Sequence, residues 1–423
     1  MLDLKLIRSD PERIKAALAR RGAADGVDEL LALDARRREL LPEIENAQAQ
    51  RKALSKQIGE AKQRGEDAAG PMAEVQALKE RIESGKAELE RVEADLERVA
   101  TALPNLPDPE APEGMTEEDA VVLREVGEKP SFDFEPRDHL ELGTELGLIE
   151  MEAAAKLSGS RFAYLMGDLV LLELALVRFA LELVRGEGHE PVVPPVLVRE
   201  EALHGTGFLP GDRDQIYEIP KDELFLVGTS EVSLAALHAD QILDAGELPL
   251  RYAGLSTCFR REAGAAGRDT RGIFRVHQFD KVEMFSFVEP SQSAAEHERL
   301  LAIEERILSE LEIPYRVVNV AAGDLGAPAA KKYDCEAWIP SQARYRELTS
   351  CSNTTDYQAR RLKARYRPAD GESAEVVHTL NGTAVAVGRT MIALIENRQE
   401  RDGSFSVPKA LHSLGAPERI GGS

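Results

Sequence analysis

The sequence predicts an α+β protein in which an antiparallel helical hairpin, a coiled coil, precedes a body built on a mainly antiparallel sheet with flanking helices. The first observation is that apolar residues recur in alternating steps of three and four between residues 28 and 103. Such steps average about 3.5 residues, the period of a coiled-coil seam. The second observation is that short β-rich runs follow between residues 137 and 423. Irregular loops separate them instead of regular crossover helices, which favours antiparallel pairing.

Both helices of the hairpin carry this seam, and a turn signal separates them at residues 65–71. Two helices joined by a short Gly/Pro turn pack antiparallel. Arg37 and Arg51 occupy seam positions of the first helix and are its two charged exceptions. The other seam residues of the first helix are Leu30, Leu33, Leu40, Ile44, Ala47, Leu54, Ile58 and Ala61, and those of the second are Val75, Leu78, Ile82, Gly85, Leu89, Val92, Leu96, Val99 and Leu103.

The two helices of the hairpin differ in charge. Residues 36–64 hold eight basic and four acidic side chains, whereas residues 74–98 hold five basic and eight acidic ones. One interpretation is a solvated helical pair with ion pairs between the helices. The other is that the first helix follows a phosphate backbone. Charge alone favours the first interpretation.

The overall composition suits a globular protein of two or more domains. The chain has 423 residues, a formal net charge of −22, 43% hydrophobic residues and 30% charged residues. The acidic balance argues against a nucleic-acid partner only weakly, because such binding depends on a local basic patch. No apolar run approaches the roughly 20 residues that span a bilayer, and the first residues lack a signal-peptide pattern. The three cysteines form no CxxC pair, so we expect a reduced, cytoplasmic protein without a membrane partner.

A proline-rich stretch predicts a domain boundary. Residues 104–136 hold six prolines among acidic residues, a density that forbids a long helix. The predicted organisation is therefore a helical arm at residues 1–103, a linker at 104–136 and the body at 137–423.

The body begins with a predicted amphipathic helix and continues with short strands. Asp168 is predicted to cap a helix that runs to Arg185, with Gly186 beyond it. No GxxxxGK[ST] or GxGxxG sequence follows a predicted strand, so the common phosphate-binding loops are not indicated. The predicted strands are residues 190–198, 224–227, 281–288, 315–320 and 376–380.

Three groups of residues in the body suggest phosphate chemistry. Residues 259–262 read Phe-Arg-Arg-Glu and precede an arginine- and glycine-rich loop that contains Arg268 and Arg271. Arginines at the edges of a strand–loop–strand unit can bind a triphosphate, although a surface hairpin with ion pairs would look similar. Arg389 follows a small-residue strand that two glycines bracket, where it can reach a terminal phosphate or lie on the surface. Glu347 and Ser350 can both face one Mg²⁺ ion, which is weak evidence alone.

Together these groups resemble the class II aminoacyl-tRNA synthetases. Residues 259–262 are similar to motif 2 of that class, residues 382–389 to motif 3, and residues 188–195 to motif 1, the dimer-forming strand. With its helical arm, the chain resembles the bacterial-type seryl-tRNA synthetase family from residue 1 to about residue 410. Thr229-Ser230-Glu231 is similar to the amino-acid-binding TxE motif of the class.

The resemblance implies an enzyme that activates L-serine with ATP and Mg²⁺ and passes the seryl group to tRNA(Ser), and also to tRNA(Sec). It implies a homodimer without zinc. Two alternatives are a related enzyme that loads a carrier other than tRNA, and a non-catalytic coiled-coil paralogue that binds tRNA. The intact arm speaks against the first, and retention of the motif arginines and carboxylates speaks against the second.

The resemblance also implies the roles of individual residues. Arg260 and Arg389 would be the catalytic residues that hold phosphates, and Glu347 and Ser350 would bind Mg²⁺. Serine would be bound by Thr229, Ser230, Glu231, Arg260, Glu283 and Thr383. ATP would be bound by Arg260, Arg261, Glu262, Val276, Phe279, Glu347, Leu348, Thr349, Ser350 and Arg389. The arm would contact the tRNA through Arg36, Arg37 and Arg51.

Overall fold

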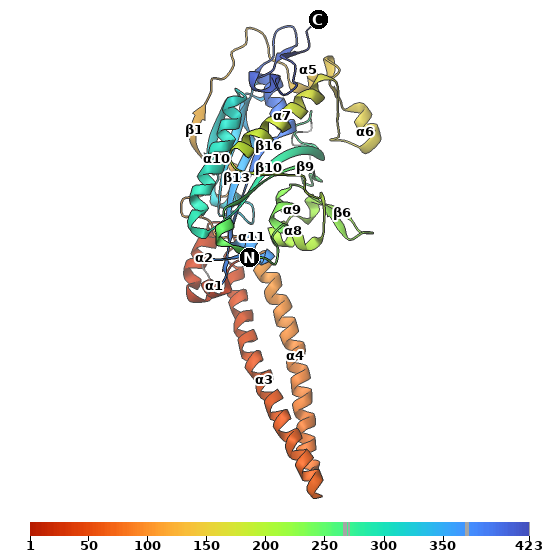
Figure 1. Cartoon of the computed structure of the whole chain (residues 1–423), viewed down its shortest axis with the longest axis vertical. Helices are drawn as coiled ribbons and strands as arrows, with labels where there is room; N and C mark the ends of the chain where they lie inside the picture. The colour runs from red at the N-terminus through yellow and green to blue at the C-terminus, as the bar shows by residue number, and fades with distance from the viewer. Residues whose placement is uncertain (265–268, 270, 369–371, 423) are drawn as a thin grey trace. The chain divides into compact units, whose positions relative to one another are not determined.

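The chain folds into two compact units, Leu2–Leu103 and Pro104–Ser423, with Met1 belonging to the second. The computed structural model describes residues 1–264, 269, 271–368 and 372–422. Figure 1 shows the first unit in red and orange, and the second from light orange through to blue.

The first unit is the predicted helical arm. Two short helices, α1 (Leu4–Ser9) and α2 (Pro11–Ala19), precede the long helices α3 (Gly26–Arg64) and α4 (Ala69–Ala102). The long helices lie side by side along their length (Figure 1), which confirms the predicted hairpin. Pro71, expected within the turn, lies in the first turn of α4, where proline is tolerated because its missing N–H has no helical partner there.

Apolar seam residues and ion pairs hold α3 and α4 together. Ile44 and Ala47 of α3 are buried, as are Leu78 and Ile82 of α4. Gly85 of α4 permits a close approach, because a Cβ at this position would lie 3.0 Å from Cγ1 of Ile44.

The charged exceptions in the seam behave differently from one another. Arg36, next to the seam, pairs with Glu88 of α4 at 2.7 Å, while Arg37 lies 4.0 Å from the buried Asp34. Arg51 is exposed although it occupies a seam position in the sequence. The long arginine side chain reaches water, so it leaves the seam without disturbing the helix.

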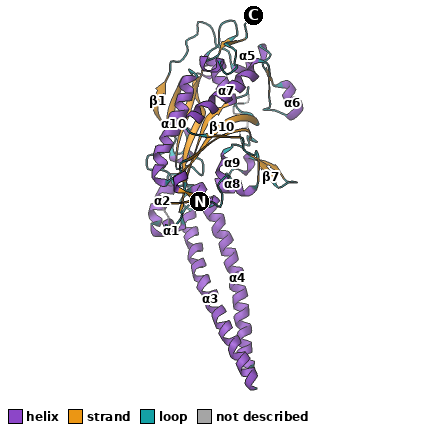
Figure 2. Ribbon diagram, viewed as in Figure 1, coloured by secondary structure: helices purple, strands orange, loops and turns teal. Residues whose placement is uncertain are grey.

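The second unit is built on an eight-stranded sheet in the order β1-β11-β12-β13-β16-β10-β9-β4. Every neighbouring pair is antiparallel except β4 and β9, which confirms the predicted mainly antiparallel sheet. Its strands are orange in Figure 2. The strands are β1 (Val121–Val126), β4 (Glu190–Val192), β9 (Leu250–Phe259), β10 (Gln278–Val288), β11 (Tyr315–Asn319), β12 (Lys331–Ile339), β13 (Arg344–Thr355) and β16 (His378–Ala386).

Four of these strands, β1, β9, β12 and β13, were not predicted from the sequence. The sequences of β12 and β13 mix lysines, arginines and carboxylates with apolar residues, because one of their faces carries ion pairs instead of a hydrophobic core. The stretch expected to be a linker also contributes to the sheet. Its residues 121–126 form β1 at the edge of the sheet. No side chain of β1 is buried, so its sequence lacks the alternation of apolar and polar residues that predicts a strand.

Helices cover both faces of the sheet. Val282 and Met284 of β10 pack into a large core with α7 (Asp168–Gly186), α10 (Ser293–Glu310) and α12 (Val387–Asn397). On the other face, Phe285 and Phe287 pack against α9 (Glu231–Ala236) and α11 (Tyr357–Leu362). Alternation along β10 therefore separates the core from the face on which the cavity described below lies.

The start of α7 differs from the prediction. Asp168 is the first helical residue, not the cap, and Gly167 precedes it with a φ of 58°. Glycine takes this conformation, with a positive φ, without steric cost. The helix therefore begins one residue earlier than it would if Asp168 were its N-cap. The helix also runs through Gly186.

The remaining elements are short. The helices are α5 (His139–Glu145), α6 (Glu152–Ser158), α8 (Glu200–Thr206) and α13 (Lys409–His412). The small sheets contain β2 (Ile149–Glu150), β3 (Tyr164–Leu165), β5 (Leu197–Val198), β6 (Tyr217–Ile219), β7 (Leu224–Leu226), β8 (Ile242–Asp244), β14 (Arg365–Arg367), β15 (Glu375–Val376), β17 (Phe405–Ser406) and β18 (Arg419–Ile420). Among the described helices, each is too short or too polar to cross a membrane.

Candidate active site

A cavity of about 420 Å³ opens on the face of the sheet that α9 and α11 cover. Strands β10, β13 and β16 form its floor. Arg260, Glu262 and residues 273–276, from the segment that connects β9 to β10, form part of its wall. Its size falls within the usual range for small-molecule sites. The predicted site residues that line it are Thr229, Glu231, Arg260, Glu262, Val276, Phe279, Glu283, Glu347, Leu348, Ser350, Thr383 and Arg389.

Alternation along β10 directs three side chains into the cavity. Phe279, Lys281 and Glu283 are two residues apart, so they project from the same face of the strand. Thr383 of β16 lies directly opposite Glu283, and its Oγ1 donates a hydrogen bond to Glu283 Oε2 at 3.3 Å. A carboxylate and a hydroxyl from two strands thus meet at one point.

A β-bulge in β13 brings Glu347 and Ser350 onto one face. Residues three apart on a regular strand point to opposite faces. The register shifts, however, because Glu336 pairs with Glu347 whereas the adjacent Cys335 pairs with Thr349, which leaves Leu348 as an extra residue. The extra residue shifts the alternation of side chains between the two faces by one position. The side chains of Glu347 and Ser350 therefore both face the cavity.

A second bulge has the same effect in β16. Glu283 pairs with Thr383 and Val282 with Val385, so Ala384 is the extra residue. Thr383 and Ala386, three residues apart, therefore both line the cavity. Bulges are frequent beside active sites for this reason.

One end of the cavity is a cluster of buried carboxylates around a single lysine. Lys281 forms an ion pair with Glu283, and its Nζ donates to Thr229 Oγ1 at 2.8 Å. Glu231 Oε1 accepts hydrogen bonds from Gln358 Nε2 at 2.7 Å and Asn381 Nδ2 at 3.0 Å. Burial, reinforced by the Glu283 carboxylate, raises the pKa of Glu231 to about 7. The cluster holds two carboxyl groups, those of Glu231 and Glu283, but one lysine, so it can accommodate a ligand with a positively charged ammonium group.

The other end of the cavity is rich in cations. Arg260 donates through Nε to the carbonyl of Gly228 at 3.1 Å, and its guanidinium lies 5.3 Å from the centre of the Phe279 ring. Arg389 donates to the carbonyl of Glu347 at 2.8 Å. Burial and the neighbouring guanidinium groups lower the pKa of Arg389 despite the attraction of Glu347. Crowded cations of this kind suit a polyanionic ligand such as a triphosphate.

The carboxylate of Glu347 stands among these cations. Burial by itself raises its pKa, but Lys332, Arg389 and Arg260 outweigh burial and lower the pKa of Glu347 to about 2. Glu347 is therefore ionised at neutral pH, and with the Ser350 hydroxyl it offers the oxygen ligands that Mg²⁺ prefers.

The side chains of three predicted residues do not line the cavity. Ser230 Oγ donates to the carbonyl of Gly254 at 3.3 Å, Thr349 Oγ1 donates to Glu304 Oε2 at 2.8 Å, and Arg261 lies 5.8 Å from the Tyr217 ring. Each stands beside a residue that does line the cavity, and neighbouring side chains point in different directions. The prediction counted every residue of these motifs as a contact and therefore included three side chains that do not line the cavity.

The long loop between β9 and β10 holds both predicted and unexpected contacts. Arg268 lies outside the described residues, and Arg271 pairs with Asp138 and Glu141 instead of reaching the cavity. Glu262 has a φ of 51° and accepts from Arg275 Nη1 at 2.5 Å. This pair joins the described beginning and end of the segment between β9 and β10, beside the cavity.

Sequence reasoning missed several residues that line or support the cavity. Lys281 had a signal, because it alternates with Glu283 on the same predicted strand. Arg275 is adjacent in sequence to Val276, a predicted ATP contact. Lys332 and Gln358 had no such signal, since β12 was not predicted and Gln358 is 127 residues away from Glu231 in the sequence.

The fold and this cavity define the chain as a class II aminoacyl-tRNA synthetase. The model of the tRNA synthetase class II core domain (G, H, P, S and T) matches residues 216–398, and that of the seryl-tRNA synthetase N-terminal domain matches residues 1–107. The serine–tRNA ligases of Acidothermus cellulolyticus and Nocardia farcinica are 53% and 51% identical to the chain over 412 residues, with 97% of each protein covered.

Solved structures agree with these sequence matches. Seryl-tRNA synthetase from Pyrococcus horikoshii, complexed with ATP, superposes with a TM-score of 0.93 at 41% identity over 99% of both chains. The cytoplasmic serine–tRNA ligase of Naegleria fowleri, in complex with AMP, gives 0.87 at 32% identity over 99% of this chain and 98% of that one. The chain belongs to the seryl-tRNA synthetase family, the serine–tRNA ligases.

Replacing Lys281 with Met should destabilise the protein, because Glu283 is only 2% exposed and would lose its cation. Removing one partner of a buried ion pair costs about 3–5 kcal/mol. The double variant Lys281→Met/Glu283→Gln removes both charges and should recover most of that loss. Urea unfolding of the full chain measures both, and a double variant no more stable than Lys281→Met would contradict the expectation.

Proposed function

We propose that the cavity catalyses ATP-dependent activation of L-serine to seryl-adenylate, followed by transfer of the seryl group to tRNA(Ser). The observation that carries this proposal is that Arg260 and Glu283 line one cavity with Arg389, which is more than a hundred positions away in the sequence. The carboxylate of serine is itself the nucleophile, so the enzyme has only to position the reactants and neutralise charge.

In this proposal the cation-rich end binds ATP. Arg260 neutralises the α-phosphate and the serine carboxylate during attack, and Arg389 holds the γ-phosphate. Phe279 stacks on the adenine ring, Glu262 accepts from the adenine amino group, and Val276 contributes to the same wall. The ATP complex of the Pyrococcus horikoshii relative supports ATP as the substrate.

Glu347 and Ser350 fit Mg²⁺, because they present an ionised carboxylate and a hydroxyl on one strand face. When bound, Mg²⁺ would neutralise phosphate charge. This chain's own contribution is to hold the two ligands on one face through the Leu348 bulge.

The carboxylate end binds serine in this proposal. Thr229 and Glu231 bind the ammonium group, while Glu283 and Thr383 bind the side-chain hydroxyl. Alanine would leave these buried polar groups without partners, an arrangement that can discriminate by about 10⁴-fold. The Thr383 methyl group limits the space available for a larger side chain.

The main test is ATP–pyrophosphate exchange with each standard amino acid, followed by charging of purified tRNA. Exchange with serine alone, and transfer to tRNA(Ser), is the expected result. Exchange with serine but transfer only to another carrier would favour the first alternative enzyme. No exchange with any amino acid, together with tRNA binding, would favour the non-catalytic paralogue.

Serine binding should release a proton near neutral pH. The substrate ammonium group favours ionised Glu231 and so lowers its pKa from about 7. The complex then holds fewer protons than the free partners, so affinity should rise with pH, by up to about tenfold per unit, below that value and level off above it. Calorimetry in buffers of different ionisation enthalpy measures the release.

The matched variant Glu231→Gln should bind serine more weakly and without this pH dependence. Proton release that persists in this variant would assign the titration to another group.

We propose that the arm binds the tRNA(Ser) backbone through the basic face of α3 and recognises shape more than base edges, and that tRNA(Sec) is bound in the same way. Arg36, Arg37 and Arg51 are the proposed contacts. Arg51 is the cleanest to test, because Arg36 pairs with Glu88 and Arg37 lies beside Asp34.

Arg51→Glu should lower kcat/KM for tRNA about tenfold, equivalent to ~1.4 kcal/mol, through lost phosphate attraction. Pyrophosphate exchange should not change. Arg81→Glu, an exposed reversal on the acidic helix α4, is the control and should have a smaller effect. Equal loss of both activities in Arg51→Glu would refute this division of labour.

We also propose that the protein is a cytoplasmic homodimer. The support is a patch of exposed apolar side chains on α7 and in residues 193–197. Leu174 is 60% exposed and Val193 is 81% exposed, and both line one shallow groove. Exposed apolar groups that cluster in this way favour a protein interface, and the patch includes part of the segment similar to motif 1.

A further inference from the structure

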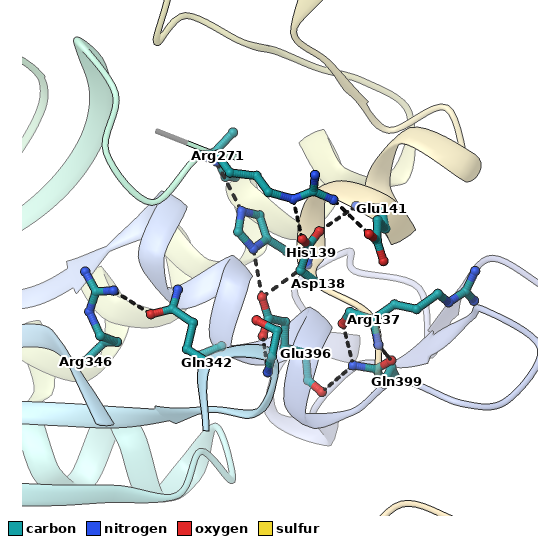
Figure 3. Close-up of polar contacts among 12 residues, drawn as sticks. Arg137, Asp138, His139, Glu141, Arg271, Gln342, Arg346, Glu396 and Gln399 are labelled. Carbon is teal, nitrogen blue, oxygen red and sulfur yellow. Dashed lines mark hydrogen bonds and ion pairs between the residues drawn. The ribbon is translucent and has the colours of Figure 1, made fainter. Parts of the chain in front are cut away.

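The end of the β9–β10 loop is fastened to α5 by polar contacts that the roles proposed above do not use (Figure 3). Arg271 donates through Nε to Asp138 Oδ2 at 2.6 Å and through Nη2 to Glu141 Oε1 at 2.8 Å. The backbone N–H of Ile273 donates to His139 Nε2 at 3.1 Å. The arginine contacts are on the surface, whereas the histidine contact is buried.

Gly272 makes the histidine contact possible. Its φ is 71°, and a Cβ built on it would lie 2.0 Å from His139 Nε2. Any other residue would both strain the backbone and collide with the ring. The loop therefore passes against His139 at a distance that only glycine permits.

The hydrogen bond from Ile273 fixes the state of the His139 ring. Because Nε2 accepts a hydrogen bond, the ring proton must be on Nδ1, which lies 2.8 Å from Glu396 Oε1. Glu396 also accepts from the backbone N–H groups of His139 and Ser341, each at 3.1 Å. Its carboxylate is fully buried with three N–H donors, so it has a firm place in the fold.

The ring thus connects two walls of the active site. Glu396 lies on α12, two turns after Arg389. Ile273 precedes Phe274 and Arg275, both of which line the cavity. The Phe274 ring is 4.7 Å from the Arg389 guanidinium, so a displacement of the loop end would change the surroundings of that arginine directly.

We propose that His139 is a positioning residue for ATP. It fixes residues 273–275 relative to α12 and thereby sets the spacing between Arg275 and Arg389. This inference rests on the proposed function, in which Arg389 holds the γ-phosphate, and adds Arg275 as a second cation whose position depends on His139. His139 itself touches no substrate.

Two variants separate the two nitrogens of the ring. In His139→Gln the side-chain oxygen can occupy the place of Nε2 and accept from Ile273. In His139→Asn the amide nitrogen can occupy the place of Nδ1 and donate to Glu396, but the Ile273 N–H is left buried without an acceptor. We expect His139→Asn to raise the KM for ATP about five- to tenfold in pyrophosphate exchange, and His139→Gln to remain within about twofold of wild type.

Two readouts distinguish positioning from a general loss of structure. The KM for serine and the melting temperature of His139→Asn should stay close to those of His139→Gln, because the two variants remove one hydrogen bond each. Equal KM values for ATP in the two variants would overturn the proposal, as would a rise in the KM for serine that matches the rise for ATP.

A second variant tests the same displacement of the loop end if His139→Asn folds poorly. Gly272→Ala leaves the His139–Glu396 pair intact but pushes the loop end away, and should reproduce the raised KM for ATP. A wild-type KM in Gly272→Ala would also overturn the proposal. Arg271→Gln is the control, since it removes only the surface contacts and should have less effect. Wild-type exchange with serine tests the proposed function separately.

Discussion

One extra residue in each of two neighbouring central strands determines which side chains reach the cavity. Leu348 in β13 and Ala384 in β16 interrupt the regular register, and each reverses the phase of alternation beyond it. Without the first, Glu347 and Ser350 would face opposite sides of the sheet. Without the second, Ala386, which lies three residues before Arg389, would face the side of the sheet opposite to Thr383. The positions of the phosphate-facing and serine-facing groups therefore depend on two local irregularities in the sheet.

The cavity separates charge between its two ends. Carboxylates surround Lys281 at one end, and arginines gather at the other. Two glutamates show the consequence, because burial raises the pKa of Glu231 to about 7, whereas cations lower that of Glu347 to about 2 against the effect of burial. Charges in such a partly desolvated site interact more strongly than in water, so a fixed arrangement can stabilise a developing charge without reorganisation. His139 extends this arrangement outward by linking the loop that carries Arg275 to the helix that carries Arg389.

Local patterns predicted the parts of the fold that have a clear period. The seam of α3 and α4 was visible because their buried residues repeat every three or four positions. Most of β10 was visible as a short β-rich run. Strands β12 and β13 were missed, since their polar faces resemble loops in composition. Arg51 was predicted to lie in the seam between the helices, but its side chain is exposed.

The sequence by itself determined the helical arm, the mainly antiparallel sheet, the family and the residue types that bear charge. These are local properties, carried by period, spacing and short motifs. Only the tertiary structure decided which motif residues face the cavity, since Ser230, Arg261 and Thr349 lie beside lining residues and point elsewhere. It also decided that Gln358 supports Glu231 and that His139 joins Ile273 to Glu396. Such contacts join residues more than a hundred positions apart, and their geometry follows from strand register and bulges that no local pattern encodes.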